Sequence, residues 1–197
     1  MPELPEVETT LRGIRPHLQG RILTSVTVRE PRLRWPVSEA LYALRDCPVV
    51  ALRRRAKYLL IELEHGQVLI HLGMSGTLRV VDATLPLRKH DHVDLLLDSG
   101  KALRFNDPRR FGMVYLTEGD GLNEHKAFIN MGPDPFSDDF TPDYLYEALA
   151  KRQGPVKTVL LNQALIAGLG NIYVCEALYL AGIHPEKKAG KGTRKQA

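Results

Sequence analysis

The stretch KYLLIELEHGQVLIH, residues 57–71, contains two apolar, β-like runs on either side of the turn signal His65-Gly66. Two such runs joined by a short glycine-containing turn are typical of neighbouring antiparallel strands. The same texture continues in both directions, and Ser75-Gly76 and Ser99-Gly100 separate further runs. We expect strands at 22–29, 49–54, 57–64, 67–72, 77–82, 92–97, 102–106 and 112–117. Many short antiparallel strands of this kind favour a β-sandwich.

Helical patterns flank the strands. An N-terminal helix is indicated by apolar residues at helical spacing, namely Val7, Leu11, Ile14 and Leu18. Beyond a linker near 138–142 the texture becomes helical. Further helices are expected at 36–45, 142–151, 155–162 and 171–181. The expected fold class is therefore α+β, with an antiparallel β-sandwich flanked by helices over 1–135 and a helical domain over 136–197.

Composition is that of an ordinary globular protein. The chain has 197 residues, of which 44% are hydrophobic and 25% charged, so one large or two small domains are possible. No apolar run reaches the length of a membrane span and no signal region precedes the first helix, so we expect a cytoplasmic protein. Cys47 and Cys175 are isolated, which is typical of reduced thiols.

Basic residues are unevenly distributed. The formal net charge is +4, and residues 183–197 alone carry five Lys/Arg and one Glu, a net of +4, so the rest of the chain is balanced. Overall basicity is therefore a weak argument for nucleic-acid binding. Local clusters could line a phosphate-binding groove if the strands bring them to one face. These clusters are Arg29, Arg32 and Arg34, then Arg53, Arg54, Arg55 and Lys57.

The N-terminal string MPELPEVE, residues 1–8, supports two interpretations. If Met1 is removed, Pro2 becomes a secondary amine with a pKa of about 7.7–8.0, which is nucleophilic near neutral pH. Such an amine can attack an aldehyde or a sugar C1′ to give a cationic iminium, and Glu3 stands beside it to move protons. The alternative is ordinary helix-start chemistry, with Pro5 in the first turn followed by acidic residues.

This string and five later segments resemble the formamidopyrimidine-DNA glycosylase (Fpg/MutM) family of bacterial base-excision repair enzymes. The later segments occur in the same order and are RRAKYLL (54–60), HLGMSG (71–76), KHDHV (89–93), DPRRFG (107–112) and AGLGNIY (167–173). The resemblance implies a bifunctional glycosylase and AP lyase that excises 8-oxoguanine and formamidopyrimidines from duplex DNA through a Schiff base on Pro2. It also implies a helix-two-turn-helix element in the helical domain.

The resemblance assigns roles to individual residues. Pro2 is the nucleophile, Glu3 moves protons, and Lys57 assists the elimination steps. Met74, Arg109 and Phe111 fill the void left by a flipped base, with Arg109 facing the orphaned base. The implied DNA contacts are His71, His90, Arg109, Arg152, Lys157 and Asn171.

Each motif also has an ordinary structural explanation. A lysine at a strand start is often simply solvated, and an exposed Met or Phe can serve local packing. The turn Gly168-Leu169-Gly170-Asn171 could be a corner between two helices. His90-x-His92 looks like half a metal site, but strand alternation explains two such histidines equally well.

Two further functional alternatives stay open. One is an oxidised-pyrimidine glycosylase of the endonuclease VIII type, although that branch typically has Gly where Leu4 stands. The other is a catalytically impaired DNA-binding fragment, for which retention of Met1 or loss of the DNA clamp is sufficient.

The resemblance also predicts partners and a cofactor. The partner is double-stranded DNA with oxidised bases or abasic sites, bound by a nucleoid-associated monomer and not by a membrane protein. Family members continue to a hairpin that usually binds zinc through four cysteines and carries a DNA-contacting arginine. This chain has no Cys-x-x-Cys and no zinc ligands of that kind. We therefore expect a C-terminally truncated member of the family and name no metal ligands in this chain.

Overall fold

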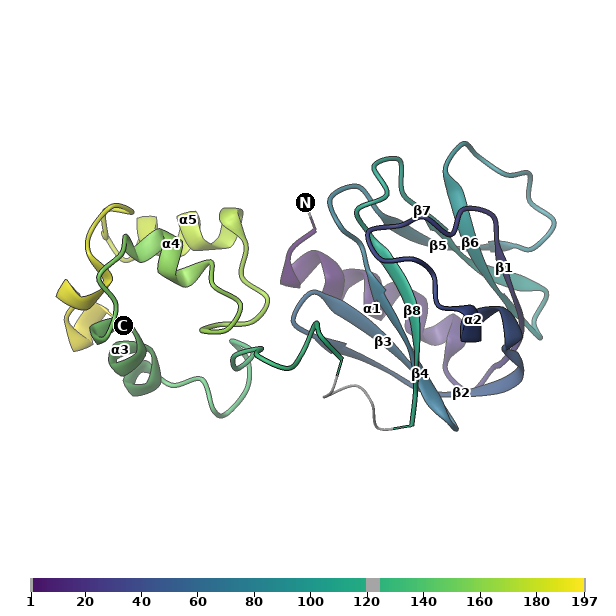
Figure 1. The fold of residues 1–197 in the computed structure, drawn as a ribbon, viewed down its shortest axis with the longest axis horizontal. Helices are drawn as coiled ribbons and strands as arrows, with labels where there is room; N and C mark the ends of the chain where they lie inside the picture. Colours follow the sequence, from purple (N-terminus) through teal and green to yellow (C-terminus); the bar gives the residue numbers. More distant parts are fainter. Residues whose placement is uncertain (1, 120–124, 197) are drawn as a thin grey trace. The chain divides into compact units, whose positions relative to one another are not determined.

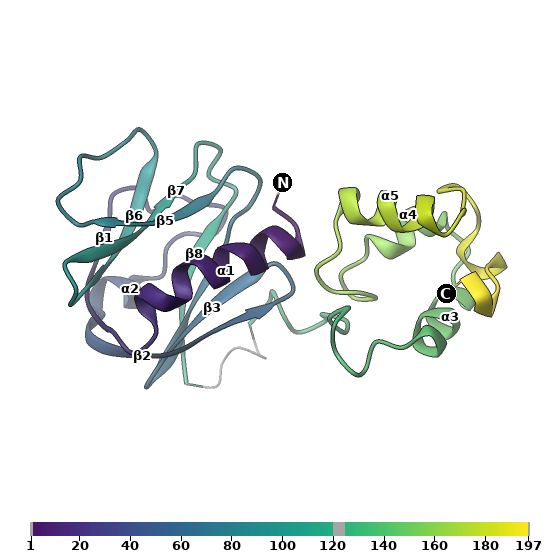
Figure 2. The ribbon, with the colours of Figure 1, turned by 180° about the vertical axis from the view of Figure 1, so that it is seen from behind.

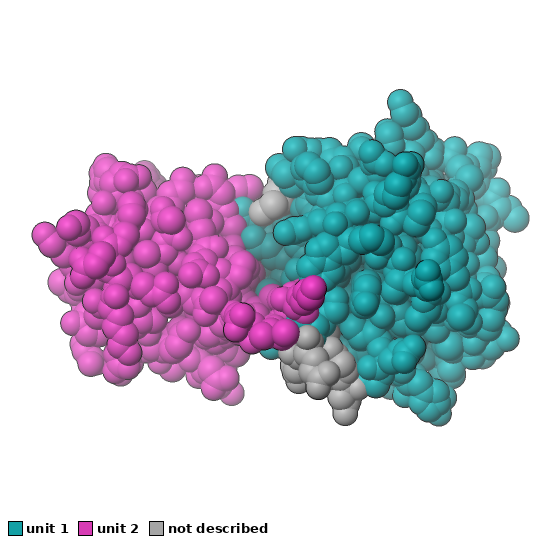
Figure 3. All heavy atoms as spheres, in the orientation of Figure 1, with its two compact units in different colours: residues 1–125 teal, residues 126–197 magenta. Residues whose placement is uncertain are grey.

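The computed structural model describes residues 2–119 and 125–196. The chain divides into two compact units, residues 1–125 and residues 126–197 (Figure 3). The sequence places the domain boundary later, between residues 135 and 136, and as a division into functional domains that boundary stays a prediction.

Unit 1 is built on eight strands that form one continuous hydrogen-bonded sheet in the order β5-β7-β6-β1-β2-β3-β4-β8 (Figure 1). Every neighbouring pair is antiparallel. The strands are β1 (Ile22–Val28), β2 (Arg45–Arg55), β3 (Tyr58–Leu63), β4 (Gly66–His71), β5 (Thr77–Asp82), β6 (Asp91–Leu97), β7 (Lys101–Asn106) and β8 (Met113–Glu118). The eight expected strands are thus confirmed.

The stretch 57–71 forms the expected hairpin, since Tyr58 pairs with His71 and Leu63 with Gly66. Strand β2 differs from the prediction, because it begins at Arg45 and not near residue 49. Its first residues pair with β1 and its later residues pair with β3. Strand β2 therefore belongs both to the half of the sheet that contains β5, β7, β6 and β1 and to the half that contains β3, β4 and β8. Pro48 interrupts the β-like pattern in the sequence, and this is why the first part of the strand was not expected.

Helix α1 (Leu4–Leu18) fastens the two halves together. Its buried face contributes Leu4, Val7, Leu11, Ile14 and Leu18. The helix contacts β2, β3 and β5, and Figure 2 shows it crossing the sheet. Burying each of these leucines contributes about 1.5–3 kcal/mol, so this face is a major part of the core. Helix α2 (Glu39–Ala43) lies within the expected range 36–45 but is shorter.

A buried ionic network joins the strands of one half of the sheet. Arg104 of β7 is 1% exposed and donates from Nε and Nη2 to the two carboxylate oxygens of Asp94, both at 2.9 Å. Arg29 donates to the same carboxylate at 2.8 Å. Arg79 donates to Asp91 at 3.0 Å. Because buried charges are costly unless paired, these contacts fix the register of β5, β6 and β7.

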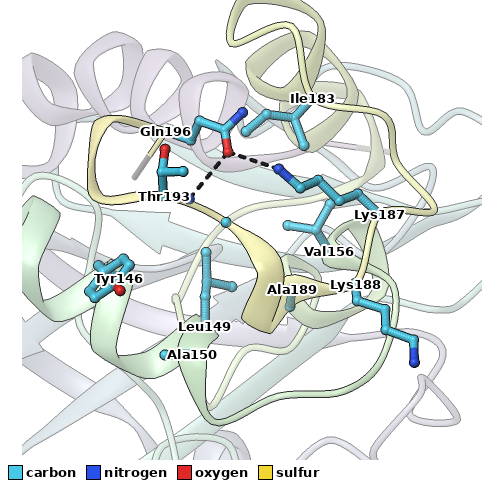
Figure 4. A pocket seen from close by; sticks show the side chains of 11 residues that line it. Tyr146, Leu149, Ala150, Val156, Ile183, Lys187, Lys188, Ala189, Thr193 and Gln196 are labelled. Atoms are coloured by element: carbon cyan, nitrogen blue, oxygen red, sulfur yellow. Dashed lines mark hydrogen bonds between the residues drawn. The ribbon is translucent and has the colours of Figure 1, made fainter.

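Unit 2 contains α3 (Pro142–Ala150), α4 (Val156–Leu160) and α5 (Asn171–Leu180), followed by the 3₁₀ turns Ala189–Lys191 and Arg194–Gln196. Thr141 caps α3 by accepting from Tyr144 N–H at 3.1 Å, so the expected linker ends in a helix cap. Apolar residues of all three helices, including Leu149, Leu160 and Val174, form a separate core. Gln196 accepts from Lys187 Nζ at 2.9 Å and so ties the last turn to this core (Figure 4). No helix among the described residues is long and apolar enough to cross a membrane.

We expect Asp94→Asn to lower the free energy of unfolding by about 3–5 kcal/mol, because it leaves the Arg104 charge buried without its main partner. Burial raises the pKa of Asp94, but hydrogen bonds from Arg104 and Arg29 outweigh it and the pKa lies below its ordinary value. The carboxylate therefore stabilises the fold fully above about pH 4, and this contribution is lost as the pH falls through the folded pKa. Denaturant unfolding across this range measures it.

Asp82→Asn is the matched control in the same half of the sheet. Its ion pair with Lys101 is exposed, so the expected loss is below about 1 kcal/mol. Equal losses for the two variants at neutral pH would contradict the importance assigned to the buried network.

Candidate active site

The N-terminal residues are held by the first turn of α1. Glu3 is the N-cap residue and forms a capping box with Glu6, whose carboxylate accepts from the Glu3 N–H at 2.9 Å. The Glu3 side chain is buried, with 1% of the residue exposed. Pro2 immediately precedes it, and Met1 lies outside the described residues. Ordinary helix-start chemistry is therefore present, and its effect is to fix Pro2 and Glu3 in place.

Lys57 lies in the two-residue turn between β2 and β3 and is 8% exposed. Burial lowers the pKa of its ammonium group, while the negative charge of Glu3 raises it, and the net pKa is below the ordinary value. The simple solvated-lysine explanation therefore fails. A buried lysine with a lowered pKa gives up its proton more readily than a solvated lysine, which suits it to proton transfer.

His71 ends β4, opposite Tyr58, and the two rings lie 4.7 Å apart. Its Nδ1 accepts from the Gly73 N–H at 2.9 Å. Burial and the positive charges of Arg34 and Lys57 lower the pKa of His71 to about 4. The imidazole is therefore neutral at physiological pH, and with Nδ1 accepting, its proton is on Nε2. His71 can thus donate one hydrogen bond, for example to a phosphate oxygen.

Met74 and Phe111 lie on neighbouring loops and are 41% and 44% exposed. Gly73, with φ of +60°, lets the loops approach closely, because a Cβ there would lie 2.4 Å from the Phe111 carbonyl carbon. The Arg109 guanidinium lies 4.8 Å from the centre of the Phe111 ring. The structure therefore brings the three predicted void-filling residues together on one rim of unit 1.

Asp107 holds these two loops together. It is fully buried, and its carboxylate accepts from Ser75 Oγ at 2.6 Å and from the Gly112 N–H at 2.8 Å. Ser75 Oγ in turn accepts from the Arg109 N–H at 3.2 Å. Sequence reasoning quoted Asp107 within the motif DPRRFG but gave it no role. Its position before a proline in a turn is the signal that could have identified it as a loop anchor.

The same residue also anchors the His90 loop. The Asp107 N–H donates to the His90 carbonyl at 3.1 Å, and the His92 ring contacts the Asp107 carbonyl at 2.8 Å through Nε2. His90 has a φ of +72°, a conformation uncommon outside glycine. The two imidazoles lie 5.9 Å apart, and His92 is engaged in the protein interior. His90 and His92 are therefore not arranged as a pair of metal ligands.

The described residues do not fit a zinc ion. They contain no group of three or more His, Cys, Asp or Glu side chains that could hold a metal. Cys47 lies in β2 of unit 1 and Cys175 in α5 of unit 2. A structural zinc site requires four converging ligands.

The basic clusters noted in the sequence are largely neutralised by acidic partners. Arg29 pairs with Asp94, Arg32 with Glu30, Arg53 with Glu62 and Arg54 with Glu8. Arg34 differs, because it is exposed and its charge acts on both His71 and Tyr58. The charge of Arg34 therefore links this exposed arginine to the candidate site.

The remaining predicted DNA contacts belong to unit 2. Asn171 is the exposed first residue of α5, and Gly170 caps the helix without a side chain. The preceding turn is fixed by Gln163, which accepts from the Gly168 N–H and donates to the Leu169 carbonyl, both at 2.8 Å. The positive end of the helix dipole at such a helix start favours an anion. Gln163 is a supporting residue that sequence reasoning missed.

Arg152 and Lys157 lie near the short α4. Arg152 is exposed just after α3, and its carbonyl accepts from the Gly190 N–H at 2.9 Å. Lys157 is half-buried in α4. Both belong to unit 2, as does Asn171.

Two family models match the chain, the formamidopyrimidine-DNA glycosylase N-terminal domain over residues 1–114 and the formamidopyrimidine-DNA glycosylase H2TH domain over residues 131–197. The chain belongs to the formamidopyrimidine-DNA glycosylase family. A glycosylase of that name from Alcanivorax borkumensis is 71% identical over 191 residues, which cover 97% of this chain and 70% of the relative. One from Klebsiella pneumoniae is 51% identical over 196 residues, covering 100% and 72%.

Solved glycosylase structures have the same fold. Lactococcus lactis Fpg in complex with DNA containing an abasic site is 34% identical, with a TM-score of 0.91 over 99% of this chain and 72% of that one. MutM (Fpg) from Thermus thermophilus is 36% identical, with a TM-score of 0.87 over 99% and 70%. The α+β fold and the family expected from the sequence are thus confirmed. The roles of individual residues in this glycosylase stay predictions.

The neutral state of His71 can be tested by NMR. We expect its ring protons to titrate with a midpoint at about 4, and Arg34→Gln to raise that midpoint because it removes a nearby positive charge. Since the pKa is lower in the folded than in the unfolded protein, His71 should reduce stability as the pH falls from about 6.5 to the folded value. His71→Gln assigns the signals. A midpoint at the ordinary pKa of histidine would contradict the effects of burial and of the nearby positive charges on His71.

Proposed function

We propose that this protein is a bifunctional DNA glycosylase and AP lyase that excises oxidised purines, such as 8-oxoguanine and formamidopyrimidines, from duplex DNA in base-excision repair. The observation that carries the proposal is that Glu3, which directly follows Pro2 at the start of α1, and Lys57 of the β2–β3 turn are both buried and interact electrostatically. The names of the relatives and the Lactococcus lactis complex with abasic-site DNA support it.

The chemistry begins at Pro2, once Met1 has been removed. The secondary amine attacks C1′, a nitrogen–carbon bond forms, and the bond from C1′ to the damaged base breaks with its electron pair leaving on the base. Glu3 transfers protons as the sugar ring opens to a cationic iminium. Loss of a C2′ proton then expels the 3′ phosphate, and Lys57 assists this elimination as a proton carrier.

DNA recognition is divided between the two units in this proposal. In unit 1, Met74 and Phe111 fill the space vacated by the flipped nucleotide, and Arg109 faces the orphaned base. His71 and His90 contact the DNA backbone. In unit 2, Arg152, Lys157 and Asn171 provide further contacts, with Asn171 at a helix start suited to phosphate. We place this activity in the cytoplasm, where the chromosome of a bacterium lies, and assign it to a monomer.

A covalent intermediate at Pro2 is the most direct test. Borohydride added during reaction with duplex DNA containing 8-oxoguanine or an abasic site should reduce the iminium and leave a protein–DNA adduct. Peptide mapping by mass spectrometry should place the adduct on residue 2, and the intact N-terminal mass should show loss of Met1. An adduct on Lys57, or one that persists when the residue-2 amine is blocked, would exclude this nucleophile.

Separate roles for Glu3 and Lys57 predict different substrate dependence. Glu3→Gln should slow removal of 8-oxoguanine by about 10²–10⁴-fold, because a positioned proton-transfer group is lost. Lys57→Ala should slow strand cutting at a preformed abasic site at least as much as it slows base removal. Single-turnover rates on the two substrates measure both effects. A Glu3→Gln loss below about tenfold, or a Lys57→Ala variant that spares abasic-site cutting, argues against these roles.

A further inference from the structure

Lys57 depends on an unusual turn. It occupies the two-residue loop between Arg55 and Tyr58, which pair with each other at the ends of β2 and β3. The other loop residue, Ala56, is 1% exposed and has a φ of +54°. This left-handed conformation is unfavourable for a residue with a Cβ, so a two-residue hairpin turn usually has Gly, Asn or Asp here. The turn therefore needs support from its surroundings.

Arg54 supplies that support. Its Nη1 donates to the Ala56 carbonyl at 2.9 Å, and this carbonyl belongs to the peptide group that joins Ala56 to Lys57. Its Nε donates to Glu8 Oε2 in α1 at 3.0 Å. The guanidinium is planar and rigid, and the side chain is only 11% exposed. One rigid group thus connects the turn that carries Lys57 to the helix that begins beside Pro2 and Glu3.

The helix side of this connection is firm. Glu8 Oε1 accepts from Arg12 at 2.9 Å, so both carboxylate oxygens are engaged. Burial raises the pKa of Glu8, but Arg12 and Arg54 outweigh it, so the carboxylate is charged at physiological pH. A separate contact, from Arg15 Nη2 to the Leu52 carbonyl at 3.1 Å, holds α1 on β2 independently of Arg54. Loss of Arg54 should therefore loosen the turn without detaching the helix.

We propose that Arg54 is a positioning residue that sets the location of the Lys57 ammonium group relative to Pro2 and Glu3, and thereby the rate of strand cutting. Arg54 acts through the backbone of the turn, at the Ala56 carbonyl. The proposal rests on the proposed function, because it requires Lys57 to take part in elimination.

Arg54→Gln tests the proposal directly, since Gln is too short to reach both Glu8 and the Ala56 carbonyl. Single-turnover strand cutting at a preformed abasic site should slow by about ten- to a hundredfold, the scale expected for a small misplacement of a catalytic group. The borohydride adduct on Pro2 should still form. As Lys57 moves toward water, the effect of burial on its pKa is lost, so the falling limb of the pH–rate profile should shift to higher pH.

Ala56→Gly provides the rescue, because glycine adopts positive φ without external support. The double variant Arg54→Gln/Ala56→Gly should regain part of the lost rate. Arg12→Gln is the matched control, since it removes another arginine from the same carboxylate and leaves the contact to the turn in place. Its rate and pH profile should equal those of the unmodified protein.

Glu8→Gln extends the test if Arg54→Gln fails to fold, as judged by thermal melting. Glu8→Gln weakens only the bond between Arg54 and the helix. It should slow strand cutting and shift the falling limb of the pH–rate profile to higher pH, but by less than Arg54→Gln does. An unchanged rate and pH limb in a folded Arg54→Gln or Glu8→Gln variant overturns the proposal. So does a slowed variant with an unshifted limb and no rescue by Ala56→Gly. Absence of a Pro2 adduct in the unmodified protein would instead refute the proposed function.

Discussion

Two ionisable side chains, Glu3 and Lys57, are both buried and interact electrostatically, and this interaction links the start of α1 to the β2–β3 turn. A single buried charge is costly, whereas a carboxylate beside an ammonium group lowers that cost for both. The pair forms only if the start of α1 and the β2–β3 turn keep a fixed relation. The apolar face of α1 provides it, because that face packs against strands from both halves of the sheet. The hydrophobic core thus determines the geometry of the candidate chemistry.

The rest of the site shows the same division between a rigid framework and exposed tips. The Asp107 carboxylate and backbone form hydrogen bonds that hold the loops carrying Met74, Arg109 and His90. The side chains of Met74 and Phe111 are exposed, and the Arg109 guanidinium lies over the Phe111 ring. Residues that insert into a base stack need a rigid support and an exposed tip, because a side chain on a flexible loop cannot displace a stacked base.

Local patterns in the sequence were sufficient for the strands, the N-terminal helix and the helices of unit 2, since each depends on periodicity and turn residues close in the chain. Local patterns were insufficient where the role of a residue depends on a partner that is distant in the sequence. Arg29, Arg53 and Arg54 look like a phosphate-binding cluster in the sequence, yet Asp94, Glu62 and Glu8 pair with them across the sheet or the helix. Asp107 and Gln163 were missed for the same reason, because their hydrogen-bond partners lie in other turns or on backbone groups.

Backbone strain supports the same location for the site. Among the described residues, Asp46, Ala56, His90 and Arg110 are the non-glycine residues with positive φ. Conformations of this kind cost about 1–3 kcal/mol each and persist only where neighbouring bonds impose them. Ala56 is held by Arg54, while the His90 carbonyl and the Arg110 N–H are held by the backbone of Asp107. Three of the four residues with positive φ therefore adjoin Lys57, Arg109 or the His90 loop, and a hydrogen bond holds each of them in place. Strain that is maintained at these positions is best understood as the means by which the fold presents Lys57, His90 and Arg109 in one conformation before DNA is bound.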